Sequence, residues 1–162
     1  MKRIASFTVD HLRLLPGLYV SRRDRVGQEV ITTLDLRLTR PNFEPVMNTA
    51  ELHTIEHLGA TYLRNAPGWG ERVVYFGPMG CRTGFYLLLA GSYTSREVLE
   101  LVRGCFAFIR DYSGSIPGAS AGECGNWQDM NLPMAKYWAA RYCAVLESAG
   151  DAQLNYPGEE DA

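Results

Sequence analysis

The alternation of apolar and polar positions predicts a pair of antiparallel strands in the first quarter of the chain. Residues 28–38 are rich in β-branched side chains and place apolar and polar residues on opposite faces. One face carries Val30, Thr32, Leu34, Leu36 and Leu38, and the other carries Ile31, Thr33, Asp35 and Arg37. Residues 17–26 precede a short turn at Gly27, so we expect them to pair with 28–38. The run Arg40-Pro41-Asn42 then prevents the strand from continuing.

After Asn48 the apolar residues recur at the spacing of a helix. Leu52, Ile55, Gly59, Tyr62 and Leu63 share this period. Asn48 followed by Glu51 is a typical N-cap with a reciprocal acid three residues later. The run Asn65-Ala66-Pro67-Gly68 is typical of a helix end. We therefore expect one helix over 48–65.

Further elements follow in an order that favours an α+β fold. Strands are predicted over 71–77 and 83–91, and helices over 94–111 and 131–148, with Gly150 as a stop. The elements do not alternate strictly as βαβ, so we expect an antiparallel β-sheet packed with helices in a single domain, residues 1–150. Residues 151–162 are acidic and lack an apolar period, which predicts a loose, flexible tail.

Composition and charge narrow the classes of partner. The 162 residues are 46% hydrophobic and 21% charged, with a formal net charge of −2. Such a balance gives no long-range attraction to nucleic acid or to an anionic membrane. The longest apolar run, 85–90, is too short to span a bilayer, and the N-terminus lacks the apolar run of a signal peptide. We expect a cytoplasmic protein without nucleic-acid or membrane partners.

The cysteines fall into two kinds. Cytosolic cysteines are rarely paired as disulfides, and no Cys-x-x-Cys pair is present. Cys105 and Cys143 lie among aromatic residues in predicted helices, so we expect core packing. Cys81 lies in a loop between two predicted strands, which would expose its thiol. A thiol near a cation has a lowered pKa and can act as a nucleophile or a base.

A metal site is predicted on the first helix, in the run His53-Thr54-Ile55-Glu56-His57. At 100° per residue, His57 projects about 40° from His53 and Glu56 about 60° to the other side. The side chains of all three share one face, so the two imidazoles can bind one ion. Arg64 projects only about 20° from His53 on that face. A catalytic site needs a third ligand, and Cys124, flanked by a flexible glycine, is the best candidate.

Two other interpretations of these residues stay open. An isolated His-x-x-x-His on a helix is more often a solvated pair, although Glu56 on the same face and the otherwise unexplained Cys124 weigh against that. The order His-x-x-Glu-His also occurs in inverzincin metallopeptidases, where Glu123 would be the alternative third ligand. A non-catalytic metal-binding domain would keep the ligands but would not need Cys81 as well.

Six motifs in order resemble the S-ribosylhomocysteine lyases, the LuxS family, which releases the precursor of the autoinducer-2 signal of quorum sensing. They are Ser6-Phe7 with Asp10-His11, Asp35-Leu36-Arg37 with Pro41-Asn42, His53-Thr54-Ile55-Glu56-His57-Leu58, Pro78-Met79-Gly80-Cys81 with Thr83-Gly84, Thr94-Ser95, and Cys124-Gly125. The resemblance spans nearly the whole chain. It implies cleavage of the thioether of S-ribosylhomocysteine to homocysteine and 4,5-dihydroxy-2,3-pentanedione, by carbonyl migration and β-elimination.

The resemblance also implies roles for single residues. His53, His57 and Cys124 would bind one divalent metal per subunit, Fe²⁺ in the cell, with Zn²⁺ or Co²⁺ also possible. Glu56 and Cys81 would be the catalytic acid/base pair. Ser6, His11 and Arg37 would help to bind the ribose, and Arg64 the amino-acid end of the substrate.

The resemblance further implies a homodimer with active sites at the interface and the segment from Ser6 to His11 close to the site. The chain departs from common family members at two positions. Tyr75 stands in place of an aspartate and Phe85 in place of a tyrosine. Both are expected near the homocysteine end of the pocket.

Overall fold

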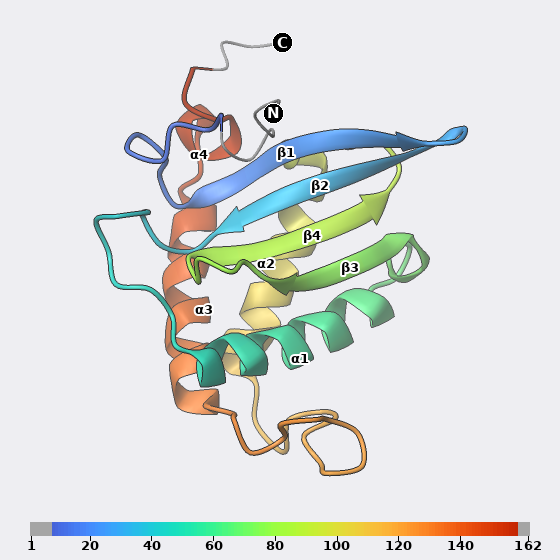
Figure 1. The fold of residues 1–162 in the computed structure, drawn as a ribbon, viewed down its shortest axis with the longest axis vertical. Helices are drawn as coiled ribbons and strands as arrows, with labels where there is room; N and C mark the ends of the chain where they lie inside the picture. The colour runs from blue at the N-terminus through green and yellow to red at the C-terminus, as the bar shows by residue number, and fades with distance from the viewer. Residues whose placement is uncertain (1–7, 159–162) are drawn as a thin grey trace, which may run out of the picture.

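A four-stranded antiparallel sheet forms one layer of the molecule in the computed structural model, which describes residues 8–158 (Figure 1). Its order is β1-β2-β4-β3. The strands are β1, Gly17–Val26; β2, Glu29–Arg37; β3, Val73–Pro78; and β4, Gly84–Ala90. The predicted hairpin and the predicted α+β fold with an antiparallel sheet are both confirmed.

Helices form the second layer: α2 and α3 cross behind the sheet, and α1 runs along β3 (Figure 1). They are α1, Thr49–Asn65; α2, Ser95–Asp111; and α3, Leu132–Glu147, with a short α4, Asp151–Leu154, and a 3₁₀ turn, Gly70–Arg72. The predicted caps at Asn48, Thr94 and Asn131 are confirmed. Among the described residues, no helix is both long and apolar enough to cross a membrane.

The hydrophobic core lies between the helices and one face of the sheet. It includes Leu34 and Leu36 of β2, as the alternation predicts, packed with residues of α1, α2 and α3. Phe85 belongs to this core, where it is fully buried and its ring stacks on Phe76 with the centroids 5.2 Å apart. Its side chain points to the opposite face of the sheet from Arg37, because Phe85 pairs with Leu36. Its expected place near the homocysteine end of a pocket stays a prediction.

The other face of the sheet buries polar groups. The strand register places Tyr19 of β1 and Tyr86 of β4 on either side of Asp35 of β2. Asp35 and Arg37, two positions apart on β2, are both buried there. A second, small hydrophobic cluster of Leu14, Tyr19 and Tyr156 covers part of this face.

The segment after Gly150 is ordered where the prediction had a loose tail. Residues 151–154 form α4, which packs against β1, and Gly150 caps this helix rather than ending the previous one. Leu154 and Tyr156 are buried. The prediction is wrong for residues 151–156, because these two apolar anchors are too few and too closely spaced to produce a detectable period.

Candidate active site

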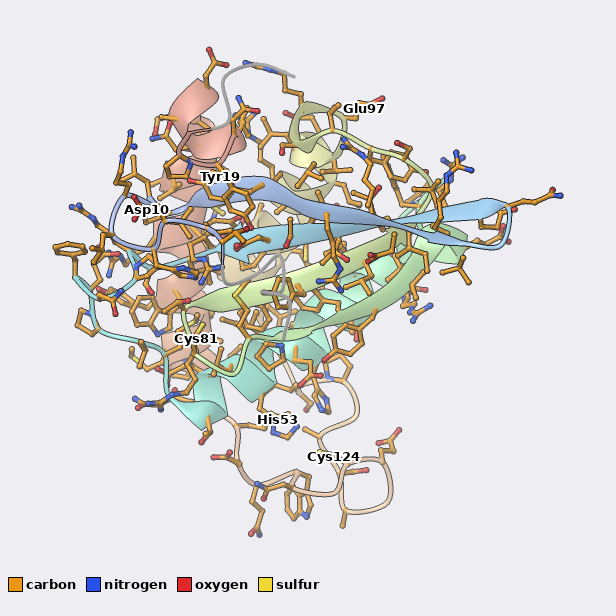
Figure 2. The ribbon with its side chains drawn as sticks, turned by 45° about the horizontal axis from the view of Figure 1, so that its top comes forward. Asp10, Tyr19, His53, Cys81, Glu97 and Cys124 are labelled. Carbon is orange, nitrogen blue, oxygen red and sulfur yellow. The ribbon has the colours of Figure 1, made fainter. Side chains whose placement is uncertain are left out.

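Helix α1 and the long loop between α2 and α3 bring two histidines and a cysteine together. The His53 and His57 rings lie one helical turn apart with centroids 4.7 Å apart. The loop places Cys124 Sγ 3.4 Å from His53 Nε2 (Figure 2). One ligand atom from each of the three residues lies within 4.8 Å of the others. The shared helix face and the addition of Cys124 are thus confirmed as geometry.

Backbone carbonyls of the same loop orient both imidazoles. His53 Nδ1 lies 3.0 Å from the Asp129 carbonyl oxygen, and His57 Nδ1 lies 2.8 Å from that of Pro117. A carbonyl oxygen can only accept a hydrogen bond, so Nδ1 of each imidazole is the protonated nitrogen that donates it. In a neutral imidazole this leaves Nε2 with a free lone pair, which is the arrangement found in histidines that bind metals.

Local backbone contacts explain why the loop comes so close to α1. Gly118 has a left-handed φ of +71°, and a Cβ added there would lie 3.3 Å from His57 Nδ1. Glycine is therefore favoured on both conformational and steric grounds. Near the other end of the loop, the Asn131 N–H donates to the Thr54 hydroxyl at 2.8 Å. The loop is fixed to the helix on both sides of Cys124.

The donor set fits a divalent transition metal. Two imidazole nitrogens and a thiolate leave a fourth position free, as in catalytic sites, and suit Fe²⁺, Zn²⁺ and Co²⁺. The Asn126 backbone N–H lies 3.5 Å from Cys124 Sγ and can donate to a thiolate there. Glu123, the alternative ligand, instead accepts a hydrogen bond from the Ser120 hydroxyl at 2.7 Å and is not part of the cluster.

Cys81 forms a second site in the loop between β3 and β4 (Figure 2). Its thiol is exposed, as predicted, whereas Cys105 and Cys143 are buried. Cys81 Sγ lies 3.1 Å from Thr83 Oγ1 and 3.8 Å from Arg37 Nη1. Desolvation alone would raise the pKa of the Cys81 thiol, but hydrogen bonds from Thr83 and the positive charge of Arg37 lower this pKa below its usual value. The predicted direction of the pKa change is confirmed.

Arg37 is held in place by a buried ion pair. Its Nε donates to Asp35 Oδ1 at 3.1 Å and its Nη2 to Asp35 Oδ2 at 2.6 Å, a two-pronged contact. Its Nη1 donates to Thr83 Oγ1 at 2.5 Å. Neither Asp35 nor Thr83 had a predicted role of its own. Their positions, two residues from Arg37 and Cys81 respectively, were the available signal.

Within residues 8–158, the remaining predicted residues form no hydrogen bond to either site. Glu56 is partly buried on α1, next to His57. His11 Nδ1 lies 2.9 Å from the Val9 carbonyl oxygen. Arg64 is exposed and donates to the carbonyls of Val73 and Val74 at 2.5 and 3.1 Å. Ser6 lies outside the described residues.

Comparison with known proteins bears on the function of these sites. The profile of the S-ribosylhomocysteinase (LuxS) family matches residues 4–152. The chain is 60% identical over 157 residues to the S-ribosylhomocysteine lyase of Clostridium acetobutylicum, a match that covers 97% of this chain and 99% of the relative. The chain belongs to the LuxS family. Other lyases of this name, from Clostridium beijerinckii and Finegoldia magna, are 56% and 55% identical over the same shares.

The region matched by the LuxS family includes the residues of both sites. In this LuxS protein the candidate metal-binding group includes Cys124 and not the neighbouring Glu123. The alternative of an inverzincin metallopeptidase is not favoured, since it would use a carboxylate ligand and would need no thiol of lowered pKa.

Proposed function

We propose that this S-ribosylhomocysteine lyase uses Cys81 and Glu56 as its acid/base pair, with a divalent metal, Fe²⁺ in the cell, bound by His53, His57 and Cys124. The observation that carries the proposal is the Cys81 thiol held beside Arg37 and Thr83, because these contacts lower its pKa and so favour the thiolate, which is a competent base. Glu56 is supported by its place on the ligand-bearing face of α1, adjacent to His57.

The reaction requires protons to be moved before the sulfur can leave. The thioether carbon of the substrate has no activating neighbour, so the sugar carbonyl must first migrate from C1 to C3. Each migration moves a proton from one carbon to the next, so electrons balance without a redox cofactor. A divalent ion in the cluster supplies Lewis acidity toward substrate oxygens.

In this scheme Cys81 and Glu56 take each proton from one carbon and return it to the neighbouring one. Once the ketone is at C3, the hydrogen on C4 is acidic. Removal of that proton forms a C4–C5 double bond and breaks the C5–S bond, and homocysteine leaves as the thiol after taking up a proton. The positive charge of Arg37, whose Nη1 lies 3.8 Å from Cys81 Sγ, lowers the pKa of the thiol and so favours the ionised sulfur that must accept the proton.

Substrate recognition is assigned to residues around these groups. We propose that Ser6, His11 and Arg37 contact the ribose and that Arg64 contacts the amino-acid end of the substrate. Arg64 is supported by its exposed guanidinium, although binding there would have to compete with its hydrogen bonds to β3. Tyr75, which is exposed on β3, is a further candidate to line the pocket around the amino-acid end of the substrate.

We further propose a homodimer with the active sites at its interface. Large apolar side chains are exposed close to predicted substrate contacts: Leu12, beside His11, is 64% exposed, and Tyr75 of β3 is 47% exposed. A second subunit would cover such groups and help to enclose a small polar substrate. Light scattering should give twice the chain mass at micromolar concentration, and a fully active monomer would contradict this proposal.

We also place the protein in the cytoplasm, which is supported by its four cysteines, all of which are free.

The function itself is tested by incubating the metal-loaded protein with S-ribosylhomocysteine and measuring free thiol with a chromogenic thiol reagent. Release of one thiol per substrate consumed is expected. Absence of thiol release by fully metal-loaded, folded protein would contradict the proposal.

A further inference from the structure

Tyr156, close to the end of the described chain, contacts a buried ion pair on the sheet. Its hydroxyl donates to Asp35 Oδ2 at 2.7 Å, the same oxygen that accepts from Arg37 Nη2 at 2.6 Å. Asp35 is 1% exposed and Tyr156 is 7% exposed. Water therefore does not compete effectively for this hydrogen bond, and its contribution is larger than on a surface.

The contacts continue from Asp35 to the thiol of Cys81. Asp35 fixes both Nε and Nη2 of Arg37. Because a guanidinium is planar and rigid, fixing two of its nitrogens also fixes the direction of the third, Nη1. That nitrogen donates to Thr83 and lies 3.8 Å from Cys81 Sγ. The orientation of Asp35 thus sets the position of the positive charge that faces Cys81.

Apolar contacts hold Tyr156 in place for this role. Its ring stacks on Tyr19 of β1 with the centroids 4.9 Å apart and 15° between the planes. The Tyr19 hydroxyl lies 3.3 Å from the Ala152 carbonyl oxygen of α4, and Leu154 of the same helix is buried in the main core. Packing of the ring and of α4 therefore does not depend on the Tyr156 hydroxyl.

We infer that Tyr156 is a positioning residue, which acts through Asp35 to hold the guanidinium of Arg37 toward the sulfur of Cys81. The inference rests on the acid/base role proposed above for Cys81. It gives the C-terminal segment a part in the active site that its sequence did not indicate.

The other polar groups around this network do not replace Tyr156. The groups that interact with it are Tyr19, Ser21 and Arg22 of β1, Tyr86 of β4, Thr83 of the loop before β4, and Tyr142 of α3. Ser21 also shares a hydrogen bond with the Tyr156 hydroxyl, but it does not contact Asp35 in place of Tyr156. Burial, followed by the charge of Asp35, raises the pKa of Tyr19, Tyr86 and Tyr142, so all three stay neutral at physiological pH. The charges that matter there are those of Asp35, Arg37, Cys81 and Arg22.

Replacement of Tyr156 by phenylalanine tests the inference, because it keeps the stacked ring and removes only the hydroxyl. The metal-loaded protein is alkylated with iodoacetamide across a pH series, and modification of Cys81 is followed by mass spectrometry of its peptide. Loss of one buried hydrogen bond to a charged group should slow alkylation at pH 7 by about 3- to 10-fold. The midpoint of the pH profile should move to higher pH, and kcat/KM should recover at high pH.

The control is Tyr142→Phe, the same change at a buried tyrosine whose hydroxyl donates to the Gly17 carbonyl at 2.8 Å. Its Cys81 profile should match that of the parent protein. Thermal unfolding and metal content of both variants show whether each is folded and loaded. An unchanged profile in Tyr156→Phe, or an equal change in both variants, would overturn the inference. That result would leave the acid/base role of Cys81 intact, since that role is tested separately by thiol release from a Cys81 variant.

Discussion

Arg37 Nη1 lies 3.8 Å from Cys81 Sγ, and the Thr83 hydroxyl lies within hydrogen-bond distance of both atoms. Arg37 lies at the end of β2, whereas Cys81 and Thr83 lie in the loop between β3 and β4. The antiparallel pairing of these strands, with Arg37 opposite Gly84, is what brings them together. The pKa of the Cys81 thiol is therefore a property of the sheet register as well as of the loop.

The first prediction concerns the pH dependence of turnover. In the proposed mechanism the Cys81 thiolate is the active form, and the pKa of this thiol is lowered in the folded protein. Activity should therefore rise with pH at pH values below the usual pKa of a cysteine thiol. Thr83→Val removes a hydrogen bond to the thiolate and should shift this rise to higher pH. Thr39→Val is the matched control, since the buried Thr39 hydroxyl has no hydrogen-bond partner within residues 8–158. Equal profiles for Thr83→Val and the parent protein would contradict the role assigned to Thr83.

The second prediction concerns the metal ligands. Substitution of alanine for His53, His57 or Cys124 removes one of the three proposed ligands and should lower metal affinity by at least about 100-fold. Metal content after dialysis against a weak chelator measures the loss. Glu123→Gln is the control and should keep its metal, because Glu123 bonds Ser120 and not the cluster. Metal loss in that control, with retention in Cys124→Ala, would restore the carboxylate alternative.

The third prediction concerns the loop that orients His57. Gly118→Ala adds a methyl group 3.3 Å from His57 Nδ1 at a left-handed φ of +71°, so it should displace the imidazole and weaken metal retention about tenfold. Gly114→Ala is a matched control in the same loop, with a φ of +119° and no atom within 4 Å of the added carbon. Gly114→Ala should have the conformational cost of an alanine at positive φ, but it should not lose metal. Similar metal affinity in both variants would mean that the Pro117 contact does not orient His57.

The sequence predicted what depends on local pattern. Helical spacing placed His53 and His57 on one face, and capping residues marked the start of α1, α2 and α3, because these signals act over three or four residues. The link from Tyr156 to Asp35 spans 121 positions and joins two residues that show no local pattern.

The fourth prediction tests the packing of the C-terminal segment. Leu154→Ala leaves a cavity in the core and should lower the free energy of unfolding by about 2 kcal/mol. Asn155→Ala, a change at an exposed neighbouring position, should cost less than about 0.5 kcal/mol. Chemical denaturation of both variants with bound metal measures the difference. A loose tail would instead make both changes neutral.

The last prediction concerns the central claim, that Cys81 and Glu56 carry the protons. General acid–base groups contribute about 10²–10⁴-fold each to the rate. Cys81→Ala and Glu56→Gln should therefore each lower the activity by at least about 100-fold. Cys81 is outside the metal cluster, so its variant should keep a full complement of metal. If Glu56 instead only orients a histidine, Glu56→Gln would lose metal first and activity in proportion.

The most direct measurement is thiol release from S-ribosylhomocysteine by Cys81→Ala, with metal content determined on the same sample. The proposed role predicts metal equal to that of the parent protein and no thiol release above background. Substantial thiol release, or a loss of activity that only follows a loss of metal, would contradict it.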